Sequence, residues 1–354
     1  MRIGLIIYGS LDTLSGGYLY DRKLVDFLRS QGDSLEIISL PWRNYAAHLT
    51  DNLHFRLPPD VDILIQDELN HPSLILANRG KHRYPVISLV HHLRCSELRP
   101  NWQNVLYRLV EKKYLQSVDG FIFNSRTTEK VVNSLLLNRQ PGLVAYPPTN
   151  RFGEPISEED IMARAKTDEF GILFLGNVIY RKGLHTLIQA IGDQQSAFRV
   201  DVVGSLNAEP QYVKQIQESI ALHNLSSFVF LRGPLDKEPL VEILNRAHVL
   251  VVPSSYEGFG IVYLEGMCFG LPAIGTTAGA ANEIISDGID GFLIEAENAN
   301  QLAARLKVLN ERRDVLTQMS LAARERYLRQ PKWEETAGRI REFLLKRIEE
   351  FSVY

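Results

Sequence analysis

The stretch PSSYEGFGIVYLEGMCFG, residues 253–270, decides the fold because it joins an expected strand to an expected helix through a glycine-bearing turn. The apolar run Val249–Val252 comes directly before it and is typical of a buried strand. We predict that the helix begins near Gly260, which leaves its first backbone amides without partners inside the helix. Those amides and the helix dipole favour a negative charge, so the turn is a predicted site for a phosphorylated ligand.

Two glutamates, Glu257 and Glu265, flank this turn. Carboxylates do not bind phosphate, but they accept hydrogen bonds from hydroxyl groups. A nucleotide sugar has hydroxyl-rich rings on both sides of its diphosphate, which matches a carboxylate on each side of the amides. Alternatively, Glu265 is a solvated carboxylate on a helix whose apolar stripe faces the core. The predicted donor-binding residues of this segment are Glu257, Gly258, Phe259, Gly260, Ile261, Val262 and Glu265.

The order Glu257-Gly-Phe-Gly followed by a second glutamate after seven intervening residues resembles the E-x7-E motif of the family-4 retaining glycosyltransferases. The resemblance extends from the glycine pair near residue 16 to the tryptophan near residue 333. It implies the GT-B fold, in which two Rossmann-like doubly wound domains face each other across a cleft. It also implies that Glu265 binds ribose hydroxyls and that Glu257 binds the hydroxyls of the transferred sugar.

A basic loop follows the expected strand Gly171–Leu175. In the resembled family this loop supplies a lysine and an arginine that neutralise the donor diphosphate, and Lys182 matches the lysine. Asn177 occupies the usual position of the arginine, and Arg181 is the candidate replacement. Neighbouring residues on a turn or helix do not share a face, so a solvent-facing Arg181 remains the alternative.

The first half of the chain offers further candidates at expected strand ends. Gly16 and Gly17 follow the first strand and would present amides to the diphosphate in the resembled family, although an ordinary glycine turn is the alternative. His91 follows the strand Val86–Val90 and matches the family histidine near the donor sugar and the reacting carbon. His92 is the fallback, and Ser125 would line the acceptor side of the same pocket. A purely structural histidine is the alternative for both.

The chain of 354 residues has 45% hydrophobic residues, which is enough for two cores. Strand-like and helical segments alternate along both halves, which predicts a doubly wound parallel sheet in each. We expect an acceptor-side domain at residues 1–150, a donor domain at 151–330 and a helix at 331–354 that crosses back to the first domain. A linker is expected at residues 147–153, where prolines and a glycine interrupt the pattern.

The formal net charge of −3 hides a basic segment between Arg79 and Arg151. It contains twelve Lys or Arg against four Asp or Glu, with Trp102, Tyr107 and Tyr114 among them. A solvated helix face is the simplest interpretation. An anionic membrane surface or a phosphorylated lipid acceptor is the alternative, while no recognised nucleic-acid motif accompanies the charge.

The sequence contains no apolar run long enough to cross a membrane, and its two cysteines match no metal or redox spacing. We therefore expect a cytoplasmic enzyme that can bind peripherally at the inner face of the membrane. Since no Asp-x-Asp follows a strand, we expect no metal and no cofactor besides the nucleotide-sugar co-substrate.

The expected function is metal-independent, retaining transfer of a hexosyl group to an acceptor hydroxyl, with a glycan or a lipid-linked glycan as acceptor. His91, Lys182 and Glu257 are the expected catalytic residues. A catalytically silent GT-B module that binds a nucleotide sugar or polysaccharide, favoured by Asn177, is the alternative. A nucleotide-sugar epimerase is a further one, although the acid/base pair that it needs is not found.

Overall fold

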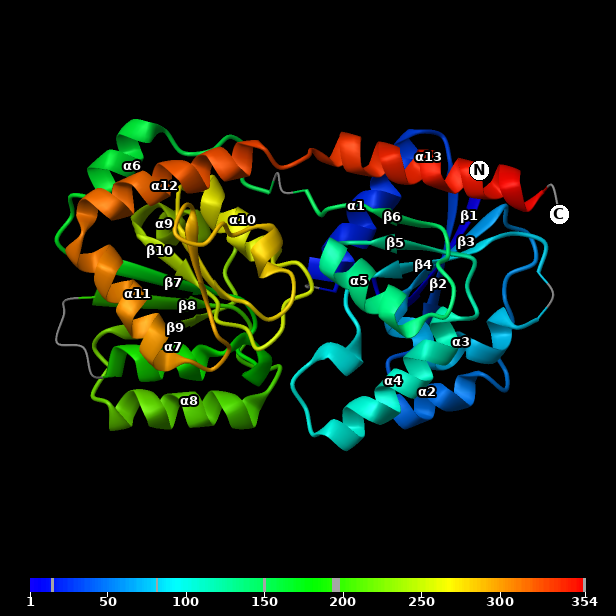
Figure 1. Ribbon diagram of the computed structural model, residues 1–354, viewed down its shortest axis with the longest axis horizontal. Helices are drawn as coiled ribbons and strands as arrows, with labels where there is room; N and C mark the ends of the chain where they lie inside the picture. Colours follow the sequence, from blue (N-terminus) through cyan, green and yellow to red (C-terminus); the bar gives the residue numbers. More distant parts are fainter. Residues whose placement is uncertain (14–15, 81, 149–150, 193–197, 353–354) are drawn as a thin grey trace. The chain divides into compact units, whose positions relative to one another are not determined.

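The computed structural model describes residues 1–13, 16–80, 82–148, 151–192 and 198–352. The chain forms two compact α/β units (Figure 1). Unit 1 consists of Met1–Pro148 together with Pro331–Tyr354, and unit 2 consists of Thr149–Gln330. Of the residues in the expected linker, Thr149 and Asn150 lie outside the described residues, as does Lys81 of the basic segment.

Unit 1 contains a six-stranded parallel sheet in the order β2-β1-β3-β4-β5-β6. Its strands are β1 (Arg2–Tyr8), β2 (Ser34–Leu40), β3 (Ile63–Asp67), β4 (Val86–Val90), β5 (Gly120–Phe123) and β6 (Gly142–Val144). Its α-helices are α1 (Gly16–Ser30), α2 (Tyr45–Asp51), α3 (His71–Asn78), α4 (Asn101–Leu115), α5 (Arg126–Leu135) and α13 (Trp333–Phe351). Short 3-10 turns, η1 (Glu68–Asn70) and η2 (Arg94–Ser96), follow β3 and β4.

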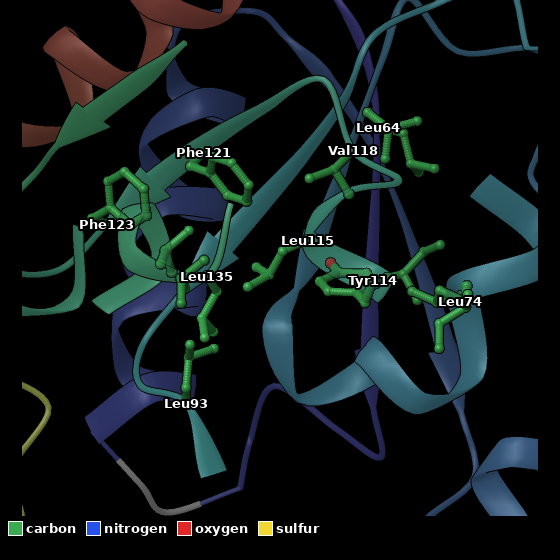
Figure 2. Close-up of a cluster of buried hydrophobic side chains, with 14 of the residues drawn as sticks. Leu64, Leu74, Leu93, Tyr114, Leu115, Val118, Phe121, Phe123 and Leu135 are labelled. Carbon is green, nitrogen blue, oxygen red and sulfur yellow. The ribbon is translucent and has the colours of Figure 1, made fainter. Parts of the chain in front are cut away.

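The sheet of unit 1 is covered on both faces because successive side chains of a strand point to opposite sides. In β3, Ile63 and Ile65 belong to the core with α1 and α13, while Leu64 belongs to the opposite core. Figure 2 shows this second core, in which Tyr114 and Leu115 at the end of α4 meet residues of the sheet. The C-terminal helix α13 contributes Trp333, Ala337, Ile340 and Leu344 to the first core.

Unit 2 repeats the architecture with a six-stranded parallel sheet in the order β12-β11-β10-β7-β8-β9. Its strands are β7 (Phe170–Leu175), β8 (Phe198–Val203), β9 (Val229–Gly233), β10 (Val249–Val251), β11 (Ala273–Thr276) and β12 (Gly291–Ile294). Its α-helices are α6 (Glu158–Arg164), α7 (Leu184–Gly192), α8 (Pro210–Leu222), α9 (Lys237–Arg246), α10 (Ile261–Cys268), α11 (Ala299–Glu311) and α12 (Arg313–Leu328). The 3-10 turns η3 (Tyr180–Lys182) and η4 (Ala281–Glu283) complete the unit.

The predicted fold class is confirmed, since both units are parallel doubly wound sheets with helices around them. Two elements differ from expectation. The expected linker at residues 147–153 is followed by an acidic segment, and α6 begins in that segment, where Ser157 caps it by accepting a hydrogen bond from the Asp160 amide. The apolar pattern predicts a helix over Val105–Leu115, and α4 begins one turn earlier, at Asn101. Among the helices of the described residues, none has the length and apolar character needed to cross a bilayer.

Candidate functional site

The strand order in the sheet of unit 2 reverses at β7. The chain continues from β7 to β8 on one side, while β10 pairs with β7 on the other. In open α/β sheets, ligands bind outside the carboxyl ends of the strands at such a switch point. Lys182 follows β7 and Glu257 follows β10, so the topology brings these two predicted residues to the same place.

Lys182 and Glu257 form a largely buried ion pair with 2.7 Å between Nζ and Oε2. The Ser254 hydroxyl donates a second hydrogen bond to the same oxygen at 3.0 Å. Burial alone would raise the pKa of Glu257, but attraction to Lys182 and Arg181 outweighs burial and holds this pKa at about 2. Burial lowers the pKa of Lys182, and the attraction of Glu257 opposes that effect. Lys182 therefore keeps Glu257 ionised, and a phosphate could compete with Glu257 for Lys182.

Arg181 reaches the same segment although it neighbours Lys182 in the chain. Its Nη1 donates to the Tyr256 carbonyl at 2.9 Å, and its own carbonyl accepts from the Ser255 amide at 2.8 Å. Neighbouring residues of a helix do not share a face, but η3 is a short 3-10 turn. Both cations therefore reach residues 256–257. Two positive charges consequently lie next to Glu257.

Helix α10 begins at Ile261, with Gly260 as its N-cap. Gly260 has φ +93°, a left-handed conformation, and a β-carbon there would lie 2.5 Å from the Tyr263 ring. Only glycine fits this entry into the helix. Gly279 supports the turn from β11, because its φ is +90° and a β-carbon would lie 2.2 Å from the Glu257 carbonyl oxygen. The start of α10 and the backbone of Glu257 are thus fixed by two glycines.

Glu265 lies in α10 and is buried. Arg151 Nη1 donates to its Oε1 at 3.3 Å. Burial raises the pKa of Glu265, and Arg151 opposes that rise. A buried carboxylate with a single, half-exposed cation as partner has capacity left for hydroxyl donors.

The remaining predicted residues of unit 2 have more ordinary surroundings. Asn177 is exposed, and its Oδ1 accepts from the Ser205 amide at 3.3 Å, which gives this residue a structural role. Phe259 is buried, whereas Gly258, Ile261 and Val262 are half-buried around the start of α10.

In unit 1 the structure brings Gly17 and His91 together. A β-carbon at Gly17 would lie 3.2 Å from the His91 ring, so the absence of a side chain leaves room for that ring. His91 Nε2 lies 3.0 Å from Asp21 Oδ1, and Asp21 is fully buried. Burial of the ring disfavours its protonation, but attraction to Asp21 and the hydrogen bond with it raise the pKa of His91 to about 9. The imidazole is therefore a fixed cation at the carboxyl end of β4.

Asp67 closes this cluster from the end of β3. Its Oδ1 accepts from the Leu69 amide at 2.9 Å, and its pKa is raised well above the ordinary value by burial and by the Asp21 charge. Within the described residues, ligand atoms of Asp21, Asp67 and His91 lie within 4.8 Å of one another. The raised pKa of His91 favours its protonated form, which has no lone pair for a metal, so we interpret the two carboxyl groups as the partners that hold this ring.

Unit 1 contains another buried cluster of acids and a histidine, which consists of Glu68, His71 and Glu111. Glu111 accepts from the amides of Arg94 and Cys95, at 2.6 Å and 3.2 Å. His71 Nε2 lies 2.8 Å from the Tyr45 hydroxyl and its Nδ1 lies 2.9 Å from the Glu68 carbonyl oxygen, so both ring nitrogens already have partners. We therefore interpret this cluster as structural.

The other predicted residues of unit 1 are His92, Ser125 and Gly16. His92 Nε2 lies 2.9 Å from Glu97 Oε1. Ser125 is the N-cap of α5, where its hydroxyl accepts from the Thr128 amide at 3.1 Å. Gly16 is exposed at the first position of α1.

Sequence reasoning missed four residues of these clusters: Ser254, Arg151, Asp21 and Asp67. Asp21 had a readable signal, because it lies four residues after Gly17 and so shares a helix face with it. Asp67 ends β3, whereas the apolar run Val61–Ile65 predicts a strand that ends two residues earlier. Nothing in one sequence links Arg151 to Glu265, which is 114 residues away.

Comparison with known proteins finds similarity to glycosyltransferases. Residues 157–326 match the family model of the glycosyl transferases group 1. An uncharacterised glycosyltransferase of Methanocaldococcus jannaschii is 31% identical over 188 residues, which are 53% of this chain and 48% of that protein. The chain thus spans about half the length of this curated relative.

Two solved structures are similar over almost the whole chain. Sucrose-phosphate synthase from Thermosynechococcus elongatus has a TM-score of 0.82 at 20% identity, covering 99% of both chains. Anabaena HepE in complex with UDP-glucose has a TM-score of 0.75 at 17% identity, covering 98% of this chain and 100% of that one. Residues 157–326, nearly all of unit 2, thus match the model of the group 1 glycosyl transferases, and the chain as a whole has the fold of these two structures.

Proposed function

We propose that this protein is a retaining, metal-independent glycosyltransferase of family 4 that transfers a hexosyl group from a nucleotide diphosphate sugar to an acceptor hydroxyl. The observation that carries the proposal is the Lys182–Glu257 ion pair beside the start of α10. It combines a cation for the departing diphosphate with a carboxylate for sugar hydroxyls, at the switch point of a group 1 domain.

The chemical task is to stabilise the negative charge that develops on the departing diphosphate. We assign this to Lys182, Arg181 and the amides at residues 260–262. The incoming phosphate replaces Glu257 as the partner of Lys182, which frees the carboxylate to accept hydrogen bonds from the sugar. Glu265 then accepts hydrogen bonds from the ribose, as its incomplete pairing with Arg151 allows.

In unit 1 we assign the transferred sugar to His91 and the diphosphate to the amides of Gly16 and Gly17. The Asp21 carboxylate holds the His91 ring in one orientation. A fixed, protonated imidazole donates a hydrogen bond from each available N–H, which suits either a sugar hydroxyl or a phosphate oxygen. The departing phosphate oxygen itself serves as base for the acceptor hydroxyl in this proposal.

We propose a glycan or lipid-linked glycan as the acceptor, in peripheral contact with an anionic membrane. The basic segment supports this part of the proposal, since its residues in unit 1, 79–148, include eleven Lys or Arg against four Asp or Glu. HepE, crystallised with UDP-glucose, supports a UDP-sugar as the first donor to test.

The test is a panel of UDP-, GDP- and ADP-sugars, screened by thermal shift and then by turnover in excess chelator. A ligand that binds only the folded state raises the melting temperature. The proposal requires a donor that is consumed, a product with the donor's anomeric configuration in its NMR spectrum, and activity that survives the chelator. Donor binding without any turnover would instead favour a silent binding module, and a strict need for added magnesium or manganese would contradict the metal-free mechanism.

A further inference from the structure

Helix α4 is unusual in unit 1 because its first ten residues, 101–110, include none that is buried. Its buried residues are Glu111, Tyr114 and Leu115, at its C-terminal end, and Tyr107 and Val110 pack against the core while half-buried. Most helices gain their stability by packing an apolar face against the protein. Several apolar residues of α4 are exposed instead, so packing within the chain does not account for them.

That outer face is a continuous apolar stripe, defined by Trp102, Val105, Leu106 and Leu109. These residues have the spacing i, i+3, i+4 and i+7, which places them on one side of a helix. They are 65%, 56%, 55% and 54% exposed. Leu98, just before the helix, is 58% exposed and adds to the same apolar segment of the chain. Single exposed apolar residues are normal, whereas a contiguous set of this kind marks an interaction surface.

Positive charge accompanies the stripe. Arg108 and Lys113 are exposed and Lys112 is half-exposed, all on α4. Within the described part of the chain, no ion pair joins these three cations to a carboxylate. The acid of α4, Glu111, is buried and accepts hydrogen bonds from two backbone amides. The exposed side of the helix is therefore apolar and cationic, without a carboxylate of its own.

We propose that the α4 stripe lies in the interface of an anionic lipid bilayer, with Trp102 and Leu109 among the acyl chains and the three cations at the headgroups. This inference deepens the membrane contact of the proposed function and rests on it. An amphipathic helix with a basic polar side and a Trp/Leu apolar side binds a bilayer in this way. Trp is also favoured at the boundary between headgroups and acyl chains.

The charges favour a bilayer over a second copy of the chain as the occupant. Two α4 stripes pressed together would bring Arg108, Lys112 and Lys113 of both copies to one interface without an exposed carboxylate of either helix. Like charges in an interface oppose association. An anionic bilayer instead supplies the missing negative charge.

The test uses the full chain and sedimentation with vesicles of phosphatidylcholine, with and without phosphatidylglycerol. We expect binding to the anionic vesicles that weakens as salt rises, because screening acts within about 8–10 Å. Trp102→Ser combined with Leu109→Ser should lower the partition coefficient by about tenfold or more, since the apolar area of both side chains no longer enters the bilayer. Reversing the three cations to Glu should remove the preference for anionic lipid.

A matched control is Leu222→Ser combined with Leu328→Ser, two exposed leucines of unit 2 at 78% and 49%. It should bind vesicles as the unchanged protein does. Three results would overturn the inference: no binding to anionic vesicles at low salt, full binding by the Trp102/Leu109 variant, or a dimer that this variant abolishes. Donor turnover measured without vesicles separates the membrane proposal from the proposed function. The Trp102/Leu109 variant should retain this turnover. If the proposed function is wrong, neither the unchanged protein nor any variant will show turnover.

Discussion

Replacing Lys182 with methionine keeps the length of the side chain and removes its charge. In the protein Lys182 Nζ lies 2.7 Å from Glu257 Oε2, and the Glu257 side chain is largely buried. The substitution therefore leaves a carboxylate in a poorly hydrated position with only Ser254 and the neighbouring Arg181 to stabilise its charge. Removing one partner of a buried pair is costly for this reason.

The magnitude follows from the pKa of Glu257, which lies at about 2 against an ordinary value of 4.5. At about 1.4 kcal/mol per pKa unit, this difference corresponds to about 3 kcal/mol of folding free energy, to which Lys182, Arg181 and Ser254 all contribute. Because the folded-state pKa is the lower one, this stabilisation is present above about pH 4.5 and is lost as the pH falls towards 2. Burial lowers the pKa of Lys182 itself, so its replacement also removes a desolvation cost. The Lys182→Met variant should therefore be less stable by about 1–3 kcal/mol at pH 7, with a smaller deficit below pH 4.

Urea unfolding followed by circular dichroism measures the deficit, and hydrogen exchange at β7 and β10 assigns it to unit 2. The control is Lys214→Met, which removes an exposed lysine 3.9 Å from Glu218 and should cost no more than about 0.5 kcal/mol. Equal stability of the two variants at pH 7 would refute the reasoning. A deficit that grew on acidification would refute it as well.

Four further substitutions test the site. Asp21→Asn should lower the pKa of His91 from about 9 towards its ordinary value of 6.5, because it removes the strongest attraction that opposes burial. NMR titration of the ring measures the change, and a value that stays near 9 would show that Asp21 is not the cause. Gly279→Ala should displace the backbone of Glu257 and cost about 1–3 kcal/mol, measured by thermal or urea unfolding. Glu265→Ala should mainly weaken nucleotide binding, whereas Glu257→Ala should mainly lower turnover, because only sugar contacts change as the glycosidic bond breaks. Calorimetry and kinetics that showed equal loss of nucleotide affinity would reverse that assignment.

The control for the glycine substitution is Gly233→Ala. Gly233 also has a positive φ, +71°, but a β-carbon there has nothing within 4 Å. Its cost should be the backbone term alone, about 1–2 kcal/mol. If both substitutions cost the same and leave donor binding unchanged, the contact between Gly279 and Glu257 does not shape the site.

The sequence carried most of the fold because its strands are apolar runs that alternate with helical patterns. The helices that it did not reveal have weak patterns. Helix α2 is seven residues long and buries two polar residues, His48 and Asp51, while the first three residues of α6 are acidic. Short helices of this kind are held by caps and tertiary contacts, which a periodicity does not record.

The candidate site was predictable where its residues follow strands of one sheet. Lys182 and Glu257 each come after a strand, and the parallel order brings those ends together. Asp21 and Arg151 act through partners on distant segments, so their positions depend on the folded chain. The exposed stripe of α4 was likewise hidden, because an apolar helix pattern ordinarily indicates a buried face.

The most direct test of the donor site is hydrogen exchange of the protein with and without the nucleotide sugar that it consumes. The account predicts that, in unit 2, exchange slows in the two segments that carry Lys182 and the start of α10, residues 176–183 and 253–266. Protection should weaken in the Lys182→Met variant at equal donor concentration. Unchanged exchange in both segments at saturating donor would contradict the proposed site.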